Sequence, residues 1–284
     1  MKQPIFLFHR LLLELQSNCN RECFFCNRVG DLSGKRIGPD GKKNVRFMPT
    51  ENALDIMNQA KEIGFNGLIS FHHMSEPFLD PRIIDMAWEA KKRGMIPYEH
   101  TNGDMLKDND SLCKAASEVF KYIVIGLYDY QNDKELSDAK QFWQHKLHGT
   151  QVRFSLAGQV FPRTFAPFDT RMFRDKKTYP HGVCQMPLFR LIIHYDGNVA
   201  LCCEDMMSAF ELGNAFQTPI RDIWYSKKHV QIIQDLAKGD RTKYPLCSVC
   251  PIPPSPSFIQ RLIGKVVRAG KKVRNRVLQP DPSN

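Results

Sequence analysis

Apolar residues in the first half of the chain follow two alternating patterns, short runs and helical repeats. Apolar runs typical of buried parallel strands occur at residues 8–16, 67–71, 96–100, 122–127 and 152–157. Between these runs, apolar positions recur every three to four residues, which predicts helices at residues 50–64, 80–94, 110–120 and 133–147. Strands that alternate with helices of this length are typical of βαβ units, so we predict an α/β fold with a parallel sheet.

Local signals indicate where two of these helices begin and end. Thr50 is the predicted N-cap of the first helix, and Gly64 is expected to end it. The second helix is expected to begin at Asp80-Pro81, with proline at its favoured first position, and to end near Gly94.

The alternation of strands and helices stops after about residue 164. Two apolar runs, 191–195 and 199–203, flank Asp196-Gly197-Asn198, and this sequence predicts a β-hairpin. An amphipathic helix is expected at residues 220–238. We therefore predict three parts: an α/β domain at 1–165, a small α+β domain at 166–257 and a tail at 258–284.

The composition is that of a globular protein. Hydrophobic residues make up 42% of the 284 residues and charged residues 25%. No uninterrupted apolar stretch approaches the length of a membrane span. The apolar run at residues 4–8 is followed at once by His9 and Arg10, which makes it a poor signal peptide, so we predict a cytoplasmic location and reduced thiols.

The predicted tail carries much of the positive charge. Seven Lys or Arg and one Asp lie between Phe258 and Asn284, so this stretch holds +6 of the formal net charge of +10. Its apolar residues repeat at helical spacing up to Val267, which predicts a basic amphipathic helix. Such a helix binds an anionic surface or an acidic partner, or packs on the body of the protein. No aromatic platform or base-reading motif supports nucleic-acid binding.

Three cysteines, Cys19, Cys23 and Cys26, follow the first predicted strand with the spacing C-x3-C-x2-C. Thiolates are soft ligands that suit iron–sulfur clusters and zinc. A [4Fe–4S] cluster normally takes one cysteine on each of its four irons, so three cysteines leave one iron open to another ligand. A zinc knuckle or a set of buried free thiols is the alternative, although zinc sites usually show paired C-x2-C motifs or nearby histidines.

This loop, with an aromatic residue before its last cysteine, resembles that of the radical S-adenosylmethionine enzymes. The resemblance implies that Cys19, Cys23 and Cys26 hold a [4Fe–4S] cluster whose open iron binds S-adenosylmethionine, and that Phe25 lies against the adenine. It also implies a partial (β/α)6 barrel, similar to a TIM barrel, with its chemistry at the carboxyl ends of the strands. Reductive cleavage of the cofactor then yields a 5′-deoxyadenosyl radical that removes a hydrogen atom from the substrate.

Two further segments fit this resemblance. Met74-Ser75-Glu76-Pro77 follows the second predicted strand, where the family has a GGEP segment that contacts the methionine moiety; both glycines are absent here and the Glu-Pro pair is kept. Glu76 is thus expected to bind the ammonium group of the cofactor, or else to cap the next helix. Asn102 is expected to contact the ribose or the substrate, although Asn-Gly is also a common turn.

Arg153 and a pair of histidines are the remaining candidates in the barrel. Arg153 is either an anchor for an anionic or hydroxylated substrate or a solvated charge at a strand end. His72 and His73 alternate faces, so only one of them can point into the barrel. A satisfied polar residue at the end of a strand is the simpler interpretation of this pair.

A second set of cysteines lies in the C-terminal half: Cys184, Cys202, Cys247 and Cys250. Because C-x2-C is a common zinc spacing, a four-cysteine zinc site is one interpretation. The order of the motifs resembles the SPASM/twitch extension of radical S-adenosylmethionine enzymes, with gaps similar to those of aminocyclitol dehydrogenases of the butirosin type. This resemblance implies one auxiliary [4Fe–4S] cluster and favours Cys202 over Cys203 as its second ligand. Cys113, in a predicted helix, is expected to be a buried core thiol.

Together these resemblances predict a radical S-adenosylmethionine oxidoreductase with two [4Fe–4S] clusters. The leading hypothesis is oxidation of an alcohol of a sugar or cyclitol-like substrate, with the auxiliary cluster as electron acceptor and an external donor such as flavodoxin or ferredoxin. A peptide-modifying maturase is the alternative, although no winged-helix pattern for peptide recognition precedes the barrel. Epimerisation, with Cys203 or Cys113 as hydrogen-atom donor, is a third hypothesis, and a zinc-binding interaction scaffold is a fourth.

Overall fold

The computed structural model describes residues 5–23, 26, 44–130, 132–156, 178–206 and 208–255. The strands are β1 (Arg10–Leu13), β2 (Leu68–Ser70), β3 (Ile96–Pro97), β4 (Glu99–Thr101), β5 (Tyr122–Leu127), β6 (Gln151–Leu156), β7 (Arg190–Ile193) and β8 (Val199–Ala200). The helices are α1 (Thr50–Glu62), η2 (Pro77–Leu79), α2 (Ile83–Lys92), α3 (Asp104–Lys107), α4 (Asp110–Val119), α5 (Asp133–Lys146), α6 (Met186–Phe189), α7 (Ile220–Trp224), α8 (Lys227–Lys238) and α9 (Pro245–Ser248). Phe25, the predicted domain boundary at residue 165 and the predicted tail helix lie outside the described residues.

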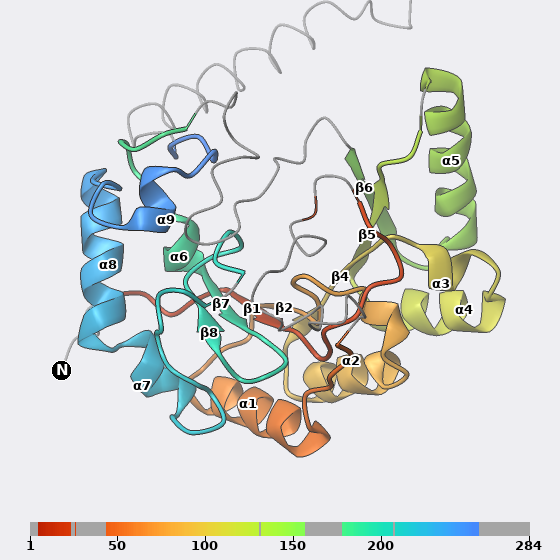
Figure 1. Cartoon of the computed structure of the whole chain (residues 1–284). Helices are drawn as coiled ribbons and strands as arrows, with labels where there is room; N and C mark the ends of the chain where they lie inside the picture. Colours follow the sequence, from red (N-terminus) through yellow and green to blue (C-terminus); the bar gives the residue numbers. More distant parts are fainter. Residues whose placement is uncertain are drawn as a thin grey trace, which may run out of the picture.

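The strands form two sheets, in the orders β8-β7-β1-β2-β3 and β4-β5-β6. Only Tyr98 separates β3 from β4, so the second sheet continues the first (Figure 1). Every neighbouring pair is parallel except β7 and β8. Helices α1, α2, α4 and α5 lie along the outer side of the strands (Figure 1). This arrangement confirms the predicted α/β class with its parallel, TIM-like sheet.

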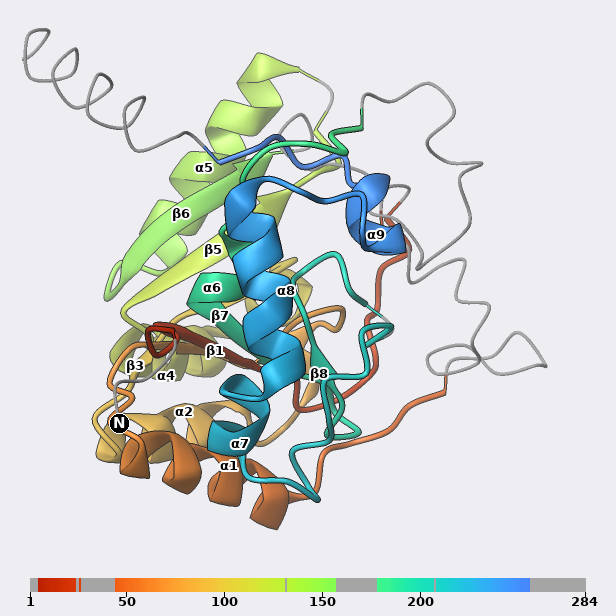
Figure 2. The same ribbon diagram turned by 90° about the vertical axis from the view of Figure 1, so that its left-hand side faces the viewer.

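The C-terminal region shares the sheet of the barrel. β7 pairs in parallel with β1, with Arg10 opposite Arg190 and Leu13 opposite Ile193. β8 returns antiparallel to β7 around Gly197, which has a φ of 83° and so favours glycine. The predicted hairpin is therefore present, and its first strand extends the sheet beside β1. Helix α8 crosses in front of this edge of the molecule (Figure 2).

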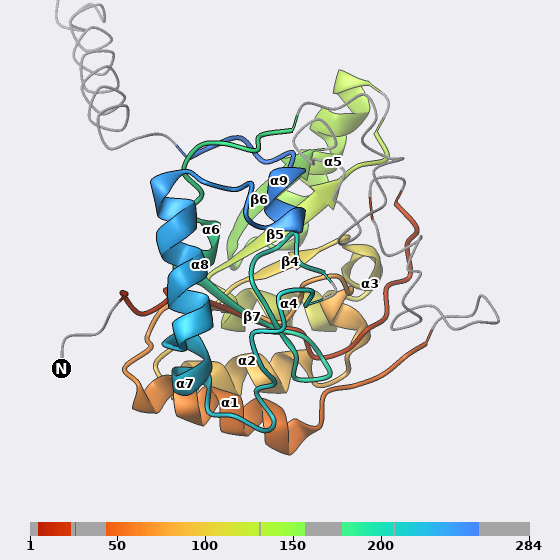
Figure 3. The same ribbon diagram turned by 60° about the vertical axis from the view of Figure 1, so that its left-hand side comes forward.

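Trp224 holds this region against the start of the chain. It is fully buried, its indole Nε1 donates to the carbonyl of Phe6 at 3.0 Å, and its ring meets Phe8 edge-on at 5.1 Å between centroids. Gln59 of α1 accepts a hydrogen bond from the backbone N–H of Ile220 at 2.9 Å, where α7 lies on α1 (Figure 3). Buried aromatic contacts and paired polar groups of this kind fix two elements relative to one another.

The predicted beginning of α2 is wrong by about three residues. Asp80 and Pro81 form a turn after η2, and the helix begins at Ile83. The cause is the Asp80 carboxylate, which accepts from the backbone N–H of Arg82 at 2.9 Å and from its guanidinium at 2.7 Å. Thr50 is not the N-cap of α1 either, because its hydroxyl oxygen accepts from the Arg82 guanidinium at 2.8 Å.

Two predicted elements are divided in the structure. The helix expected at 220–238 is α7 followed by α8, because Ser226 leaves the helical conformation and its hydroxyl accepts from the backbone N–H of His229 at 3.2 Å. The strand expected at 96–100 is divided at Tyr98 into β3 and β4. Within the described residues, no helix is both long enough and apolar enough to cross a membrane.

Candidate active site

A cavity of about 330 Å³ opens at the carboxyl ends of the barrel strands. Its walls come from the cysteine loop after β1, from the segment 72–76 after β2, and from the ends of β4, β5 and β6. The C-terminal region closes it with Cys203, Glu204 and Ile252. A hollow of about 480 Å³ at the opposite ends of the strands is lined by Lys91, Lys121 and other residues and holds no cysteine. The chemistry-bearing residues therefore converge on the first cavity.

The three cysteines of the first motif all line this cavity. The loop makes a tight turn in which the backbone N–H of Cys26 donates to the carbonyl of Cys23 at 2.8 Å. Burial raises the pKa of Cys23 to about 11, and the neighbouring thiols of Cys26 and Cys19 add to the rise. Thiols with a raised pKa become thiolates at neutral pH when they bind a metal centre. This donor set therefore fits an iron–sulfur cluster.

Neither cysteine set has the compact geometry of a single-ion site. Among the residues that the structure describes, no three His, Cys, Asp or Glu side chains are placed to hold one metal ion. A tetrahedral zinc site brings its sulfurs to one ion, whereas a [4Fe–4S] cluster takes each sulfur on a different iron. The first cysteine set lines one cavity, and three sulfurs around such a space suit a cluster.

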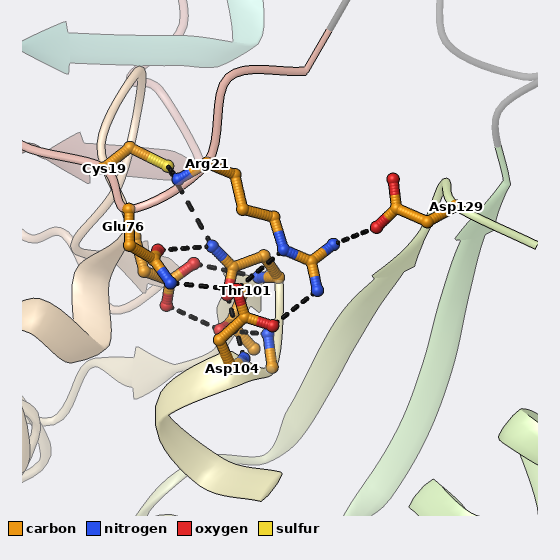
Figure 4. Close-up of polar contacts among 9 residues, drawn as sticks. Cys19, Arg21, Glu76, Thr101, Asp104 and Asp129 are labelled. Carbon is orange, nitrogen blue, oxygen red and sulfur yellow. Dashed lines mark hydrogen bonds and ion pairs between the residues drawn. The ribbon is translucent and has the colours of Figure 1, made fainter.

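Arg21, inside the first motif, clamps the cysteine loop to the ends of two strands. Its Nε and Nη2 atoms donate to the two carboxylate oxygens of Asp104 at 2.7 and 2.5 Å, and its Nη1 donates to Asp129 at 2.7 Å (Figure 4). Asn20 adds a hydrogen bond to Asp104 at 2.8 Å. The guanidinium lowers the pKa of Asp104, chiefly through these hydrogen bonds. Bidentate Arg–carboxylate pairs fix orientation as well as distance, so the clamp sets the position of the loop over the barrel.

Glu76 is buried and joins the segment after β2 to the end of β4. Its Oε1 accepts from the hydroxyl of Thr101 at 2.6 Å and its Oε2 accepts from the backbone N–H of Asn102 at 2.8 Å. It also caps η2 by accepting from the N–H of Phe78 at 3.2 Å. Burial raises the pKa of this carboxyl to about 7, although these three donors oppose the rise. The capping interpretation is thus present in the structure, and the carboxylate still lines the cavity, where a bound ammonium group would stabilise its charge.

Asn102 lies beside the cysteine loop. Its amide Nδ2 donates to Asn20 Oδ1 at 2.8 Å and lies 3.9 Å from the sulfur of Cys19. The next residue, Gly103, has a φ of 85° and starts α3, so the Asn-Gly turn that the sequence allowed is also present. Asn102 therefore connects the end of β4 to a predicted cluster ligand and faces the same cavity.

Glu99 and His72 form a pair at the cavity, of which the sequence singled out His72 and not Glu99. Glu99 is completely buried, and His72 Nδ1 lies 2.6 Å from its Oε1. Ser70 donates to the same carboxylate at 2.8 Å, as does the backbone N–H of Phe71. The His72 ring stacks on His100 with centroids 4.8 Å apart, and both rings line the cavity. Glu99 is a polar residue on a short strand, as many polar residues are, so no local sequence pattern identifies it as part of the site.

The second cysteine set is brought together from three segments. Burial raises the pKa of Cys202 well above its usual value, and the neighbouring thiols of Cys203, Cys247 and Cys250 add to the rise. Cys184 acts in the same direction on Cys247 and Cys250, and burial raises the pKa of Cys250 to about 12. The backbone N–H of Cys250 donates to the carbonyl of Cys247 at 3.3 Å. Four gathered thiols fit a second cluster by the same reasoning as the first set.

Arg241 connects the segments that carry these cysteines through hydrogen bonds to their backbone. It is 1% exposed and donates to the backbone carbonyls of Gly182 at 2.9 Å, Ile252 at 2.8 Å, Tyr179 at 3.2 Å and Val183 at 3.3 Å. Its charge opposes the rise in the pKa of Cys247 and Cys250. The Arg241 guanidinium thus connects residues 179–183 to the segment that follows α9. Its charge also acts on the thiols of the second cysteine set.

The remaining candidates occupy different places. Arg153 does not line the cavity: its guanidinium lies 3.7 Å from the centre of the Tyr122 ring and donates to Gln151 at 2.8 Å. The reason is its position on β6, two residues before Ser155, which does reach the cavity. Cys113 is buried and its thiol donates to the carbonyl of Leu106, which confirms its prediction as a core thiol.

Cys203 lines the cavity rather than the core. It is half-buried, its sulfur lies 3.8 Å from Glu204 Oε1, and its carbonyl oxygen lies 3.3 Å from His73 Nε2. At the end of β5, Tyr128 also borders the cavity, and its ring folds over Gly126, where a Cβ atom would approach the ring to 2.3 Å. The cavity wall therefore mixes hydroxyl, imidazole, carboxylate and thiol groups.

Comparisons with known proteins agree with this site. Residues 184–251 match the SPASM family, an iron–sulfur cluster-binding domain. The chain is 26% identical over 258 residues to the S-adenosyl-L-methionine-dependent 2-deoxy-scyllo-inosamine dehydrogenase of Niallia circulans, a match that covers 86% of this chain and 93% of that protein. A 98-residue stretch is 32% identical to the tungsten-containing aldehyde ferredoxin oxidoreductase cofactor-modifying protein of Pyrococcus furiosus, covering 34% of this chain and 25% of that protein.

Solved structures show the same fold. BtrN in complex with AdoMet and 2-DOIA has a TM-score of 0.70 and 22% sequence identity to this chain, and the match covers 87% of this chain and 94% of BtrN. Native anSMEcpe with bound AdoMet has a TM-score of 0.55 and 11% identity, and the match covers 93% of this chain and 99% of that one. All four cysteines of the second set fall inside the residues that match the SPASM family.

Proposed function

Because this chain belongs to the radical S-adenosylmethionine enzymes with a SPASM iron–sulfur domain, we propose that it oxidises a secondary alcohol of a sugar or cyclitol-like substrate to a ketone. The single observation that carries this proposal is the shared cavity. Cys19, Cys23 and Cys26 form one side of it, and Cys203 and Glu204, next to the predicted auxiliary ligand Cys202, form another. A substrate held between them is within reach of both centres.

The first cysteine set, with Glu76 and Asn102, is assigned to the cofactors. Cys19, Cys23 and Cys26 would hold a [4Fe–4S] cluster, and the Glu76 carboxylate would accept from the amino group of S-adenosylmethionine. When bound, the cluster and S-adenosylmethionine supply the carbon radical that removes a hydrogen atom from the substrate. Arg21 keeps the loop at the strand ends through Asp104 and Asp129.

The second set is assigned to an auxiliary [4Fe–4S] cluster held by Cys184, Cys202, Cys247 and Cys250. Oxidation of an alcohol removes two electrons in all, and removal of a hydrogen atom accounts for only one of them. The auxiliary cluster, next to the cavity residue Cys203, would accept the second electron, which a peptide or sugar epimerase does not need. The first electron would come from an external donor of the flavodoxin or ferredoxin class.

The cavity suits a small polyol better than an apolar compound. Its wall offers the imidazoles of His72 and His100, the carboxylate of Glu204 and the side chains of Tyr128 and Ser155. Hydroxyl and amino groups of a cyclitol can pair with such a set. These side chains therefore favour a hydroxylated, cationic or neutral small molecule.

The experiment is an anaerobic reaction of the reconstituted, reduced enzyme with S-adenosylmethionine and 2-deoxy-scyllo-inosamine as the first probe. We expect one 5′-deoxyadenosine for each product, a product lighter by two hydrogen atoms, and transfer of deuterium from one labelled carbinol carbon to 5′-deoxyadenosine. A panel of related aminocyclitols and sugars follows under the same conditions. Absence of a two-electron mass loss across the panel would contradict the proposal.

Epimerisation is a second candidate, because the half-buried thiol of Cys203 lines the same cavity. A thiol there can return a hydrogen atom to a carbon radical. Such a reaction leaves the product mass unchanged in ordinary water and adds one deuterium in heavy water. Cys203→Ala would abolish it, whereas Cys113→Ala would not, because Cys113 lies in the core between α3 and α4. The mass of the product thus decides between the two candidates.

A further inference from the structure

We propose that His72 is the catalytic base that takes the hydroxyl proton of the substrate, and that Glu99 positions it for this task. The inference rests on the proposed alcohol oxidation and deepens it by naming a residue for its proton transfer. It is carried by the placement of a buried carboxylate behind an imidazole that lines the cavity of the first cysteine set.

Glu99 is built to hold an imidazole in one tautomer. Its side chain is fully buried, and its Oε1 lies 2.6 Å from His72 Nδ1. The backbone N–H groups of Phe71 and His100 donate to the carboxylate at 2.8 and 2.9 Å, and these donors keep it acting as an acceptor. An accepting carboxylate places the ring proton on Nδ1, which leaves the lone pair on Nε2.

The His72 ring is fixed in orientation and partly open. Its side chain is 17% exposed, and it stacks on His100 at an interplanar angle of 28°. Nδ1 is directed at Glu99, so Nε2 is on the opposite edge of the ring, and His72 lines the cavity together with Cys23 and Glu204. A base that lines the substrate cavity and is oriented by a third group has the arrangement that proton transfer needs.

The chemistry of the proposed reaction requires such a base. Removal of a hydrogen atom from the carbinol carbon leaves a carbon radical that still bears its hydroxyl group. Conversion to the ketone breaks the O–H bond and forms the second C–O bond. The proton goes to Nε2 of His72, and the one remaining electron would go to the auxiliary cluster that Cys184, Cys202, Cys247 and Cys250 would hold. One hydrogen atom, one proton and one electron thus account for the two-electron oxidation.

Other groups at the cavity fit this task less well. Glu204 lies against the thiol of Cys203, and its Oε1 is 3.8 Å from that sulfur. Glu76 joins η2 to the end of β4, and the proposed function assigns it to the amino group of S-adenosylmethionine. Arg153 lies away from the cavity over Tyr122, and a guanidinium stays protonated in any case. Among the described cavity residues, His72 combines an oriented ring with a carboxylate behind it.

The test compares His72→Gln with His145→Gln, a histidine exposed on α5 and outside the cavity. Both variants are reconstituted anaerobically and reacted with 2-deoxy-scyllo-inosamine deuterated at its carbinol carbons. Deuterium transfer to 5′-deoxyadenosine reports the hydrogen-atom step, and ketone formation reports the proton step. For His72→Gln we expect deuterium transfer to persist while ketone formation falls by ~10²-fold, the usual size of a general-base effect. His145→Gln should keep about one 5′-deoxyadenosine per ketone.

Two measurements other than turnover accompany the test. Equilibrium binding of the probe to the unreduced enzyme should change by less than about threefold in His72→Gln, because glutamine can still donate to Glu99 and only proton acceptance is lost. Iron content should equal that of the wild type, which shows that the variant is folded. Glu99→Gln should lower ketone formation relative to deuterium transfer, since the amide can turn its NH2 group toward His72 Nδ1 and so no longer fixes one tautomer.

The outcomes are distinct. If His72→Gln makes the ketone at the wild-type rate and ratio, the assignment of the base is overturned while the proposed oxidation stands. If the wild-type enzyme cleaves S-adenosylmethionine and forms no oxidised product from any alcohol of the panel, the proposed function fails and the assignment of the base fails with it.

Discussion

Replacement of Cys19, Cys23 and Cys26 together by alanine is expected to remove about four of about eight irons per chain and to abolish cleavage of S-adenosylmethionine. The physical reason is that each of these thiolates would bind a different iron of one cluster, and all three border the cavity where the cofactor must bind. Iron and sulfide analysis of the anaerobically reconstituted variant, with measurement of 5′-deoxyadenosine after reduction, checks the result.

The matched control is Cys113→Ala. This thiol is buried and donates to the carbonyl of Leu106, far in sequence from both cysteine sets, so its loss should leave the iron content and the cleavage of S-adenosylmethionine intact. If the triple variant kept all of its iron or still produced 5′-deoxyadenosine, the assignment of the first motif to the active-site cluster would be wrong. Full retention of iron would also place both clusters on other residues.

The second large effect is expected at Arg241. Its replacement by methionine should lower the free energy of unfolding by about 3–5 kcal/mol and cost the auxiliary iron, because four backbone carbonyls lose their donor inside the protein. Lysine should rescue only part of this loss, since one ammonium group cannot reach carbonyls that the planar guanidinium spans. Urea unfolding of the reconstituted protein, monitored with iron content, measures both effects.

Arg221→Met serves as the control for Arg241. Arg221 is exposed on α7, in the same C-terminal region, and surface substitutions of this kind usually change stability by less than about 0.5 kcal/mol. If Arg241→Met unfolded at the same urea concentration as Arg221→Met and kept its iron, Arg241 would not be the tie between residues 179–183 and the segment after α9. The second cysteine set would then depend on other contacts.

Local patterns predicted the elements of this fold well, since each depends on neighbours in sequence. β5 and α4 end within one residue of their predicted limits, because a six-residue apolar run and a capped helical repeat each specify one structure. The breaks were missed for an equally physical reason. Ser226 interrupts an apolar repeat that continues across it, and the side chain that caps α8 is visible only once the backbone turns.

The contacts that position the residues of the site could not be predicted from the sequence. Arg21 meets Asp129 across 108 residues, and His72 meets Glu99 across 27 residues. Charged and polar residues of this kind are common on any surface, so no pattern selects one partner from many. The cysteine spacings were informative because the ligands of one cluster must come from short loops. Arg153 shows the opposite case: a residue on the right strand lies two positions short of the cavity.

Electron–nuclear double resonance decides whether the open iron of the first cluster binds S-adenosylmethionine. The reduced wild-type enzyme is measured with a cofactor that carries ¹⁵N at its amino group, and its iron and zinc are analysed. The account predicts about eight irons per chain, no stoichiometric zinc, and a ¹⁵N coupling that shows the amino group bound to the open iron. One zinc ion per cysteine set, or a reduced cluster with no ¹⁵N coupling, would contradict it.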